Sequence, residues 1–255
     1  MIIRKTPEQV EKMAAAGDLL VRCLQLLKSS ARPGVTTEEL DRAAEKFIRS
    51  QEAEPAFKGY RGFPGSICTS PNSMVVHGIP GPHEMKRGDV LSVDVGVVRG
   101  GWVSDAAITV PIGPVSAEAR KLLETTREAL LEGTAQARPG NHLGDVSAAI
   151  QRRVELDGFS IIRSLVGHGI GRDMHEEPQI PNYGEPGRGP PLEEGMVLAI
   201  EPMVNAGSPL VRMGDDGWAV YSQDGSLAAH FEFTVAVTAD GPRVLTPWHE
   251  DEDAE

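Results

Sequence analysis

Cysteine and aromatic residues are scarce in this chain of 255 residues. The two cysteines, Cys23 and Cys68, provide no disulfide framework and no paired spacing of zinc ligands, which fits a reducing compartment. Aromatic side chains make up 5% of the residues, so nothing indicates the stacking platforms of single-stranded nucleic-acid binders. These shortages argue against a disulfide-stabilised fold and against base stacking.

Long apolar runs and an excess of basic residues are also missing. No apolar stretch approaches the length that crosses a bilayer, and residues 1–20 contain acidic and helix-forming residues where a signal peptide needs an apolar segment. A cytoplasmic location without a membrane partner is therefore expected. The formal net charge of -12 disfavours nucleic acid as the main partner, although a local basic patch stays open.

The composition is otherwise that of an ordinary globular protein, with 40% apolar and 24% charged residues. We expect one catalytic domain over residues 1–249, because chains of this length often form a single compact unit. Residues 250–255 include five acids and are expected to form a flexible, solvated tail.

The sequence repeats itself in outline. Ala31-Arg-Pro-Gly34 recurs as Ala137-Arg-Pro-Gly140, and each copy separates two predicted helices. Helices are expected at residues 7–30, 37–50, 117–136 and 143–156. Capping boxes at residues 6–9 and 36–39 mark the start of the first two, and apolar residues at helical spacing predict that these helices pack on a sheet.

The repetition continues into the predicted strands. Gly88-Asp-Val-Leu-Ser-Val-Asp94 matches Gly195-Met-Val-Leu-Ala-Ile-Glu201, 107 residues later, and an acid ends both segments. Val76-His-Gly-Ile79 similarly matches part of Gly167-His-Gly-Ile170. We predict two pseudo-symmetric halves, about residues 1–112 and 113–249, each supplying a histidine and two acids. Duplication alone does not explain why acids persist where strands favour apolar side chains.

A β-hairpin is predicted to join a strand that carries Asp94 to one that carries Asp105. A loop of residues 99–100 or 98–101 would place the two acids opposite each other, about 5 Å apart at Cβ. A three-residue loop without a bulge would instead pair Asp105 with Val95. Buried carboxylates this close repel each other strongly unless cations lie between them.

Two further acids and a histidine occur in similar settings. Glu201 ends an apolar strand before Pro202, and Glu232 lies in a predicted strand at residues 230–237, on the face opposite its apolar side chains. His168 lies between glycines, where little bulk blocks approach to a metal. Each residue alone would more often be a salt-bridge partner or a solvated side chain. Together, four acids and one histidine suit two divalent ions, because four carboxylates would overcharge a single ion.

These five residues, in this order and context, resemble the metal ligands of the methionine aminopeptidases, which have the pita-bread fold. The resemblance covers nearly the whole chain. Its further motifs are Lys5-Thr-Pro-Glu-Gln9, Gly62-Phe-Pro64, Asn72, His77-Gly-Ile-Pro80, Gly167-His-Gly-Ile-Gly171, His175-Glu-Glu-Pro178 and Ile200-Glu-Pro-Met-Val204. It implies an internally duplicated α+β fold, with an antiparallel sheet covered by helices. The short bacterial-like type I form is expected, since the zinc-binding extension and long insertion of other forms are lacking.

The resemblance also implies the roles of the ligands. Asp94 would chelate one ion, His168 and Glu201 would bind the other, and Asp105 and Glu232 would bridge the two. The expected cofactors are two divalent ions, Co, Mn, Fe or Zn. A hydroxide between them would attack the scissile carbonyl, with Glu201 as proton acceptor.

Substrate contacts follow from the same resemblance. His77 and His175 match histidines that contact the substrate near the scissile bond, where they stabilise the intermediate or assist the leaving amine. The alternatives are a loop histidine beside a turn for His77 and a structural hydrogen-bonder for His175. The match between the segments of His77 and His168 favours a site position for His77. The predicted methionine pocket is lined by Tyr60, Phe63, Cys68, Met174 and Trp218. Ordinary core packing is the alternative for Cys68 and Met174.

Three positions depart from the commonest pattern of the family. Gly96 stands where many relatives have a threonine, Met174 where an aromatic residue is frequent, and Phe57 where a small thiol often occurs. None of them removes a predicted ligand. They bear on the shape of the pocket and on metal preference.

The expected activity is removal of the initiator methionine from nascent polypeptides whose second residue is small. Nascent N-termini are the expected partners, the ribosome is a candidate partner, and a monomer is the expected state. Because the family cuts only before small residues, this chain, which begins Met1-Ile2, should retain its own methionine.

Two alternatives stay open. A prolidase or Xaa-Pro aminopeptidase would account for Gly101-Trp-Val-Ser-Asp105, although such enzymes usually carry an additional N-terminal domain. A catalytically inactive binding protein on the same fold is the second, but such proteins typically lose ligands that are present here.

Overall fold

The computed structural model describes residues 1–249, so the predicted acidic tail at residues 250–255 lies outside the described residues. The four long helices are α1 (Pro7–Ser30), α2 (Thr37–Ser50), α3 (Ala117–Thr134) and α4 (Leu143–Leu156). Three of them have the predicted bounds. Helix α3 ends two residues earlier than predicted, because the backbone N–H groups of residues 135 and 136 turn back to carbonyls within its last turn. Within the described part of the chain, no helix has both the length and the apolar character needed to span a membrane.

Both predicted capping boxes are formed. The Thr6 hydroxyl accepts a hydrogen bond from the Gln9 backbone N–H at 3.3 Å, and the Gln9 side chain accepts one from the Thr6 backbone at 3.0 Å. Thr36 and Glu39 make the same reciprocal pair, at 3.2 Å and 2.8 Å. These bonds satisfy N–H groups that have no partner inside the helix, and so they fix where α1 and α2 begin.

The strands described by the structure form four antiparallel sheets. In the first, β4 (Val90–Arg99) pairs with β1 (Glu54–Pro55), β2 (Cys68–Pro71) and β5 (Trp102–Pro111). The second has the order β15 (Gly241–Val244), β14 (Phe233–Thr238), β9 (Val197–Ile200), β7 (Val166–Gly169) and β8 (Glu176–Pro181). Two smaller sheets are β13 (Ala228–His230), β10 (Met203–Asn205) and β6 (Ser160–Ile161), and β11 (Val211–Met213), β12 (Val220–Ser222) and β3 (Met74–Val76). Antiparallel strands with helices confirm the predicted α+β class.

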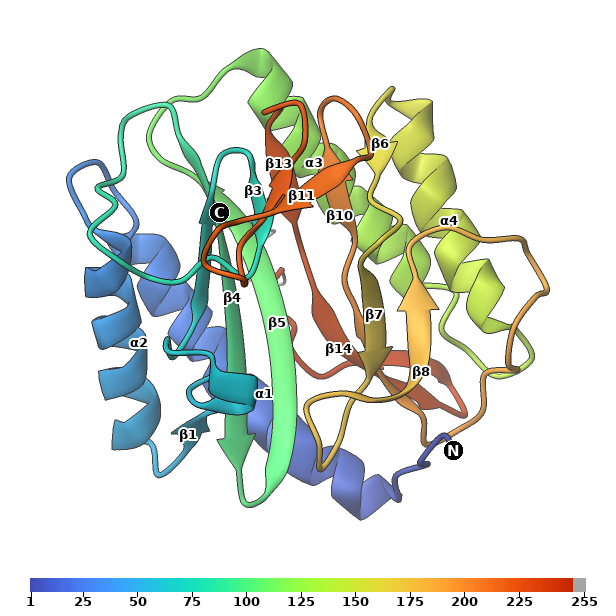
Figure 1. Cartoon of the computed structure of the whole chain (residues 1–255). Helices are drawn as coiled ribbons and strands as arrows, with labels where there is room; N and C mark the ends of the chain where they lie inside the picture. Colours follow the sequence, from blue (N-terminus) through green and yellow to red (C-terminus); the bar gives the residue numbers. More distant parts are fainter. Residues whose placement is uncertain (250–255) are drawn as a thin grey trace.

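The two larger sheets meet where β5 lies beside β14 (Figure 1). The Thr234 hydroxyl accepts a hydrogen bond from the backbone N–H of Asp105 at 3.0 Å and donates one to its carbonyl at 2.8 Å. The Glu232 N–H donates to the carbonyl of Ala107 at 2.9 Å. This junction therefore brings Asp105 and Glu232, which are far apart in the sequence, to one place. The predicted pseudo-symmetric halves remain a prediction.

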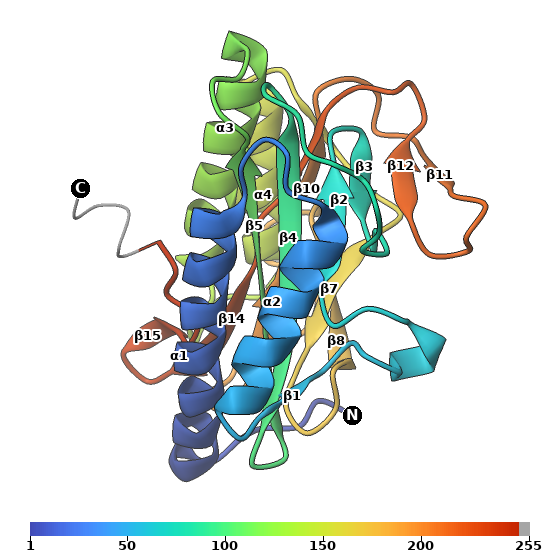
Figure 2. The same ribbon diagram turned by 90° about the vertical axis from the view of Figure 1, so that its left-hand side faces the viewer.

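The main hydrophobic core lies between the helices and the sheets. Leu20 and Leu24 of α1, Leu122 of α3, and Val93 and Val95 of β4 all belong to it, and each is at most 1% exposed. Figure 2 shows α1 and α3 along one side of the strands, with β3, β11 and β12 on the other. The helices thus support the strands from behind, and the other side stays available for a site.

The predicted register of the β4–β5 hairpin is wrong. Asp105 pairs with Gly96, and Asp94 pairs with Ala107. The turn consists of Gly100 and Gly101, whose φ angles are 58° and 74°. A tight hairpin turn favours left-handed residues at both central positions, which two glycines adopt without steric cost, whereas the predicted loop would have placed Arg99 there. The acids are consequently diagonal neighbours on one face of the sheet.

The strand predicted at residues 230–237 is also interrupted. Strand β13 ends at His230 and pairs with β10. Strand β14 begins at Phe233 and pairs with β9. Pro202, which has no backbone N–H, creates the matching break between β9 and β10. Glu201 and Glu232 lie in these two breaks. The predicted apolar face is nevertheless confirmed, because the main core contains Phe231, Phe233, Val235 and Val237.

Candidate metal centre and active site

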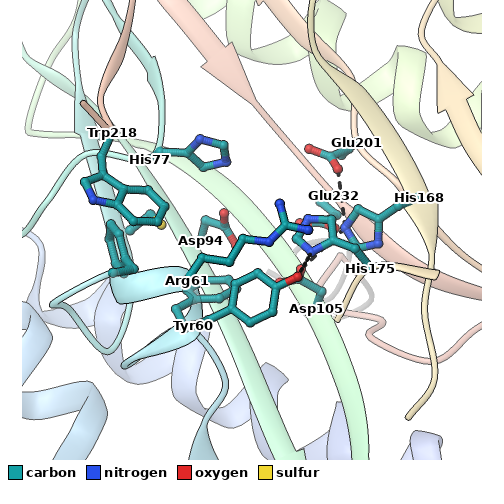
Figure 3. Close-up of a pocket in the computed structure, with 13 residues that line it drawn as sticks. Tyr60, Arg61, His77, Asp94, Asp105, His168, His175, Glu201, Trp218 and Glu232 are labelled. Atoms are coloured by element: carbon teal, nitrogen blue, oxygen red, sulfur yellow. Dashed lines mark hydrogen bonds and ion pairs between the residues drawn. The ribbon is translucent and has the colours of Figure 1, made fainter. Parts of the chain in front are cut away.

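A cavity with about 140 Å³ of space for water opens between the two larger sheets. Figure 3 shows the side chains that line it. They are Phe57, Tyr60, Arg61, Phe63, Cys68, His77, Asp94, Asp105, His168, His175, Glu201, Trp218 and Glu232. All five predicted metal ligands and both predicted substrate histidines are therefore in one cavity.

The predicted ligands come from four sheet segments. Asp94 and Asp105 project from the hairpin, His168 from β7, and Glu201 and Glu232 from the two strand breaks. His168 Nε2 lies 3.7 Å from Glu201 Oε1 and 4.0 Å from Asp105 Oδ2. The donor atoms of Asp105, His168 and Glu232 lie within 4.8 Å of one another. This spacing lets a single ion contact side chains from both sheets.

The unpaired atoms of this cluster fit a bound cation. One carboxylate oxygen each of Asp94, Asp105 and Glu232 is buried without a hydrogen-bond partner among the described residues. His168 Nδ1 lies 2.9 Å from the carbonyl of Gly169, and a carbonyl can only accept, so Nδ1 carries the proton. The lone pair of Nε2 then faces the carboxylates, as metal-binding histidines require.

Burial dominates the electrostatics of the four acids. It raises the pKa of Asp94 and of Glu201 to about 7. The pKa values of Asp105 and Glu232 are also raised, by burial first and by the neighbouring carboxylates second. Negative charges this crowded are unfavourable without positive charge between them, which is what divalent cations supply.

His175 and His77 face the same cavity. Nδ1 of His175 lies 2.9 Å from the hydroxyl of Tyr60, and the two rings stack with centroids 5.4 Å apart. His175 also lies beside His168, with ring centroids 4.2 Å apart. Both side chains are open to the cavity, yet the surrounding protein displaces much of their water. This desolvation lowers the pKa of His77 to about 4 and that of His175 to about 3, so both are neutral near pH 7.

An apolar wall adjoins the acids. Phe63 and Trp218 meet edge to face with centroids 5.1 Å apart, and Tyr60 and Cys68 also line the cavity. Met174 differs from this prediction: it is 4% exposed, packs in the same apolar cluster as Phe63 and Cys68, and is not among the lining residues. Its part in methionine binding stays a prediction.

Three neighbours of the cluster were not predicted as metal ligands or substrate contacts. Phe57 and Arg61 line the cavity, and His230 is buried behind it, with Nε2 3.4 Å from Glu201 Oε2. Arg61 has a left-handed backbone, with φ of 48°, which no sequence pattern signalled. For His230 a signal existed, since it is a polar residue inside an apolar segment two positions before Glu232.

Comparison with known proteins decides the family. The model of metallopeptidase family M24 matches residues 11–239. The chain belongs to metallopeptidase family M24. A methionine aminopeptidase of Clostridium perfringens is 52% identical over 246 residues, which cover 96% of this chain and 99% of the relative. Membership of a metallopeptidase family, together with the fitting donor set, supports a divalent metal as cofactor.

Solved structures of M24 proteins confirm the pita-bread fold. The methionine aminopeptidase of Rickettsia prowazekii has a TM-score of 0.95 and 42% identity, covering 96% of this chain and 100% of its own. The prolidase of Pyrococcus furiosus has a TM-score of 0.79 and 24% identity, and 65% of its chain is covered. The prolidase likeness shows the shared fold alone, whereas the closer identities favour the methionine aminopeptidase branch of M24.

Proposed function

We propose that this M24 protein is a metal-dependent aminopeptidase that removes the N-terminal methionine from nascent polypeptides in the cytoplasm when the second residue is small. The observation that carries the proposal is the cluster of buried, unpaired carboxylate oxygens facing His168 Nε2 beside an apolar pocket. Supporting it is the 52% identity to a methionine aminopeptidase over nearly the full length of both chains. A monomer suffices, because every residue the proposal uses comes from one chain.

The proposed cofactor is a pair of divalent ions, Co, Mn, Fe or Zn. Asp94 would hold one ion, His168 and Glu201 the other, and Asp105 and Glu232 would contact both. When bound, such ions lower the pKa of a coordinated water to near neutrality and polarise a carbonyl oxygen. Two ions balance the charge of four carboxylates better than one does, which supports the number proposed.

The remaining work falls to the side chains of the chain itself. Glu201 would accept a proton and pass it to the leaving amine. His77 and His175 are neutral there, so each presents one N–H that can donate to a peptide carbonyl. The hydroxyl of Tyr60 holds Nδ1 of His175 and so fixes the direction of its ring.

The apolar wall would select the first side chain. Phe63 and Trp218 are rigid aromatic surfaces, and Cys68 adds a buried sulfur. Burial and the nearby carboxylates raise the pKa of the Cys68 thiol well above its usual range, so it acts as a small apolar group and not as a nucleophile. An unbranched thioether such as methionine is suited to this surface.

A peptide panel tests the proposal. Protein stripped of metal and reloaded with Mn, Co or Fe is given Met-Ala-Ser, Met-Leu-Ser and an Ala-Pro peptide. Release of methionine from Met-Ala-Ser alone is expected. Cleavage of the Ala-Pro peptide would move the assignment to the prolidases, and metal binding without any cleavage would indicate a binding protein. Ribosome-bound nascent chains carrying Met-Ala provide the corresponding test of the partner.

A further inference from the structure

His230 is a buried histidine whose ring has no hydrogen-bond partner among the described residues. It ends β13 and is 1% exposed, and both ring nitrogens are unpaired. Buried polar groups are usually bonded, so an unpaired imidazole in this position calls for a functional reason.

The backbone of His230 is fixed from one side. The hydroxyl of Thr109 accepts a hydrogen bond from its N–H at 2.9 Å and donates one to its carbonyl at 2.8 Å. Thr109 Oγ1 also lies 2.8 Å from the hydroxyl of Ser92. These contacts tie the end of β13 to the β4–β5 hairpin that carries Asp94 and Asp105. The ring is therefore held in place by its main chain, while its nitrogens remain unused.

The ring faces Glu201 from behind the cavity. His230 Nε2 lies 3.4 Å from Glu201 Oε2, and His168 Nε2 lies 3.7 Å from the other oxygen, Oε1. The carboxylate of Glu201 is thus placed between two imidazoles. Only His168 lines the cavity, so a substrate in the cavity would meet Glu201 without touching His230.

We propose that His230 is a positioning residue, whose Nε2–H donates a hydrogen bond to Glu201 Oε2 and so directs Oε1 toward the metal site that Glu201 shares with His168. The inference rests on the proposed function, in which Glu201 binds metal. The 3.4 Å contact is longer than an ordinary hydrogen bond, so the proposed bond forms as the two side chains adjust around a bound ion. Partners of this kind hold a ligand in the direction that the metal requires, and their loss typically costs about 10- to 100-fold in metal affinity.

Metal titration of purified full-length protein, prepared without metal, tests this role. His230→Leu and His230→Met both remove the donor and keep an apolar volume, so a folding defect in one of them does not decide the result. His230→Gln is the conservative variant, because its amide nitrogen can occupy the position of Nε2. Each is titrated with Mn by calorimetry, and Co absorption spectra report the ligands around the ion.

The expected result is a loss of about 10- to 100-fold in Mn affinity for the two apolar variants, with most of the affinity restored in His230→Gln. Thermal unfolding of the metal-free variants should occur near the temperature of the parent, because the 3.4 Å contact with Glu201 is longer than an ordinary hydrogen bond and contributes little to stability before metal binds. If His230 served only the stability of the fold, the apolar variants would unfold at a lower temperature. Their folded fraction would then bind Mn as tightly as the parent.

Three results would overturn the inference. Unchanged Mn affinity in the apolar variants would show that Glu201 needs no support from His230. A Co spectrum that loses a nitrogen ligand in all three variants would show that His230 binds the ion directly. Glu201→Gln separates the two proposals. Unchanged Mn affinity in Glu201→Gln would contradict the proposed ligand set as well as this inference. Weakened Mn affinity in Glu201→Gln, together with unchanged Mn affinity in His230→Leu, would contradict this inference alone.

Discussion

The ring of Phe57 occupies the space that a side chain at Gly96 would need. A Cβ at position 96 would lie 2.7 Å from Phe57 Cε1, 2.8 Å from Met174 Cε and 3.0 Å from the Cβ of Ala56. Gly96 pairs with Asp105 in the hairpin, so this contact sits directly beside the proposed metal ligands. The three departures noted in the sequence, at positions 57, 96 and 174, are therefore one packing arrangement, in which large side chains fill the volume left by a glycine.

Gly96→Ala should lower the free energy of unfolding by about 1–3 kcal/mol, the usual cost of overpacking a tight core. Phe57→Cys frees the space, so the cost of Gly96→Ala should be smaller in that background, and a double-mutant cycle in denaturant measures the coupling. Gly81→Ala is the matched control, because its Cβ would meet nothing nearer than 4.0 Å. Equal costs of Gly96→Ala with and without Phe57 would contradict this account of the contact.

The N-terminal segment is tied to the loop that carries His175 by a buried ion pair. Lys5 Nζ lies 2.5 Å from Glu176 Oε2, with side chains 2% and 4% exposed. Lys5→Met leaves the carboxylate of Glu176 without its cation, so a loss of about 3–5 kcal/mol is expected.

Lys12→Met supplies the comparison for that loss. Lys12 pairs with Glu8 on the surface of α1, where the side chains are 53% and 79% exposed, and such pairs contribute about 1 kcal/mol at most. Chemical denaturation of both variants, each loaded with metal, compares the two. Similar losses would mean that the buried pair is not what holds the N-terminal segment.

The stability of the metal-free protein should fall as pH rises, and bound metal should weaken this dependence. Asp94 and Glu201 have pKa values raised to about 7, so the folded metal-free protein holds protons that the unfolded chain releases near its ordinary carboxyl pKa values. The stability that protonated Asp94 and Glu201 contribute is complete at pH values below the carboxyl pKa values of the unfolded chain. It is lost as pH rises through about 7.

Thermal unfolding between about pH 5.5 and about pH 8 checks this linkage. Metal-free protein should lose stability across the range from this source, and Mn should restore it most at the upper end, since ionised ligands bind metal better. Protein with both Asp94→Asn and Glu201→Gln lacks two of the four carboxyl groups whose pKa values are raised, and should show a shallower dependence. The same steep decline in that variant would assign the effect to other residues.

Much of the fold was predictable because local chemistry specifies it. The capping residues Thr6 and Thr36 fix the starts of α1 and α2, and the alternation after Glu232 identifies the core face of β14. The register of the hairpin was not predictable, because it depends on which two residues of a Gly-rich turn adopt a positive φ. Asp94 and Asp105 still share a face. Asp105 pairs with Gly96, two positions from its predicted partner Asp94, and a shift of two positions along a strand keeps each side chain on the same face of the sheet.

The candidate site was predicted best where a charged residue interrupts an apolar strand. Acids inside apolar strands, such as Asp94, conflict with burial and so are conspicuous in a sequence. Met174 illustrates the opposite case, because an apolar residue looks the same in a pocket lining and in the packing behind it. Arg61 was missed because its place beside His175 depends on how a loop folds back on the cavity. His230 carried a signal as a polar residue in an apolar segment, but its contact with Glu201 depends on how the strands pair.

Asp105 offers the most direct test of whether the acid cluster binds the metal that drives peptide cleavage. Asp105→Asn and Asp18→Asn remove the same charge, the first from the cluster and the second from the exposed face of α1. Each is titrated with Mn and then assayed for methionine release from Met-Ala-Ser. The account predicts that Asp105→Asn loses tight Mn binding and nearly all release, while Asp18→Asn binds two ions and cleaves like the parent. Full Mn binding and cleavage by Asp105→Asn would contradict the account.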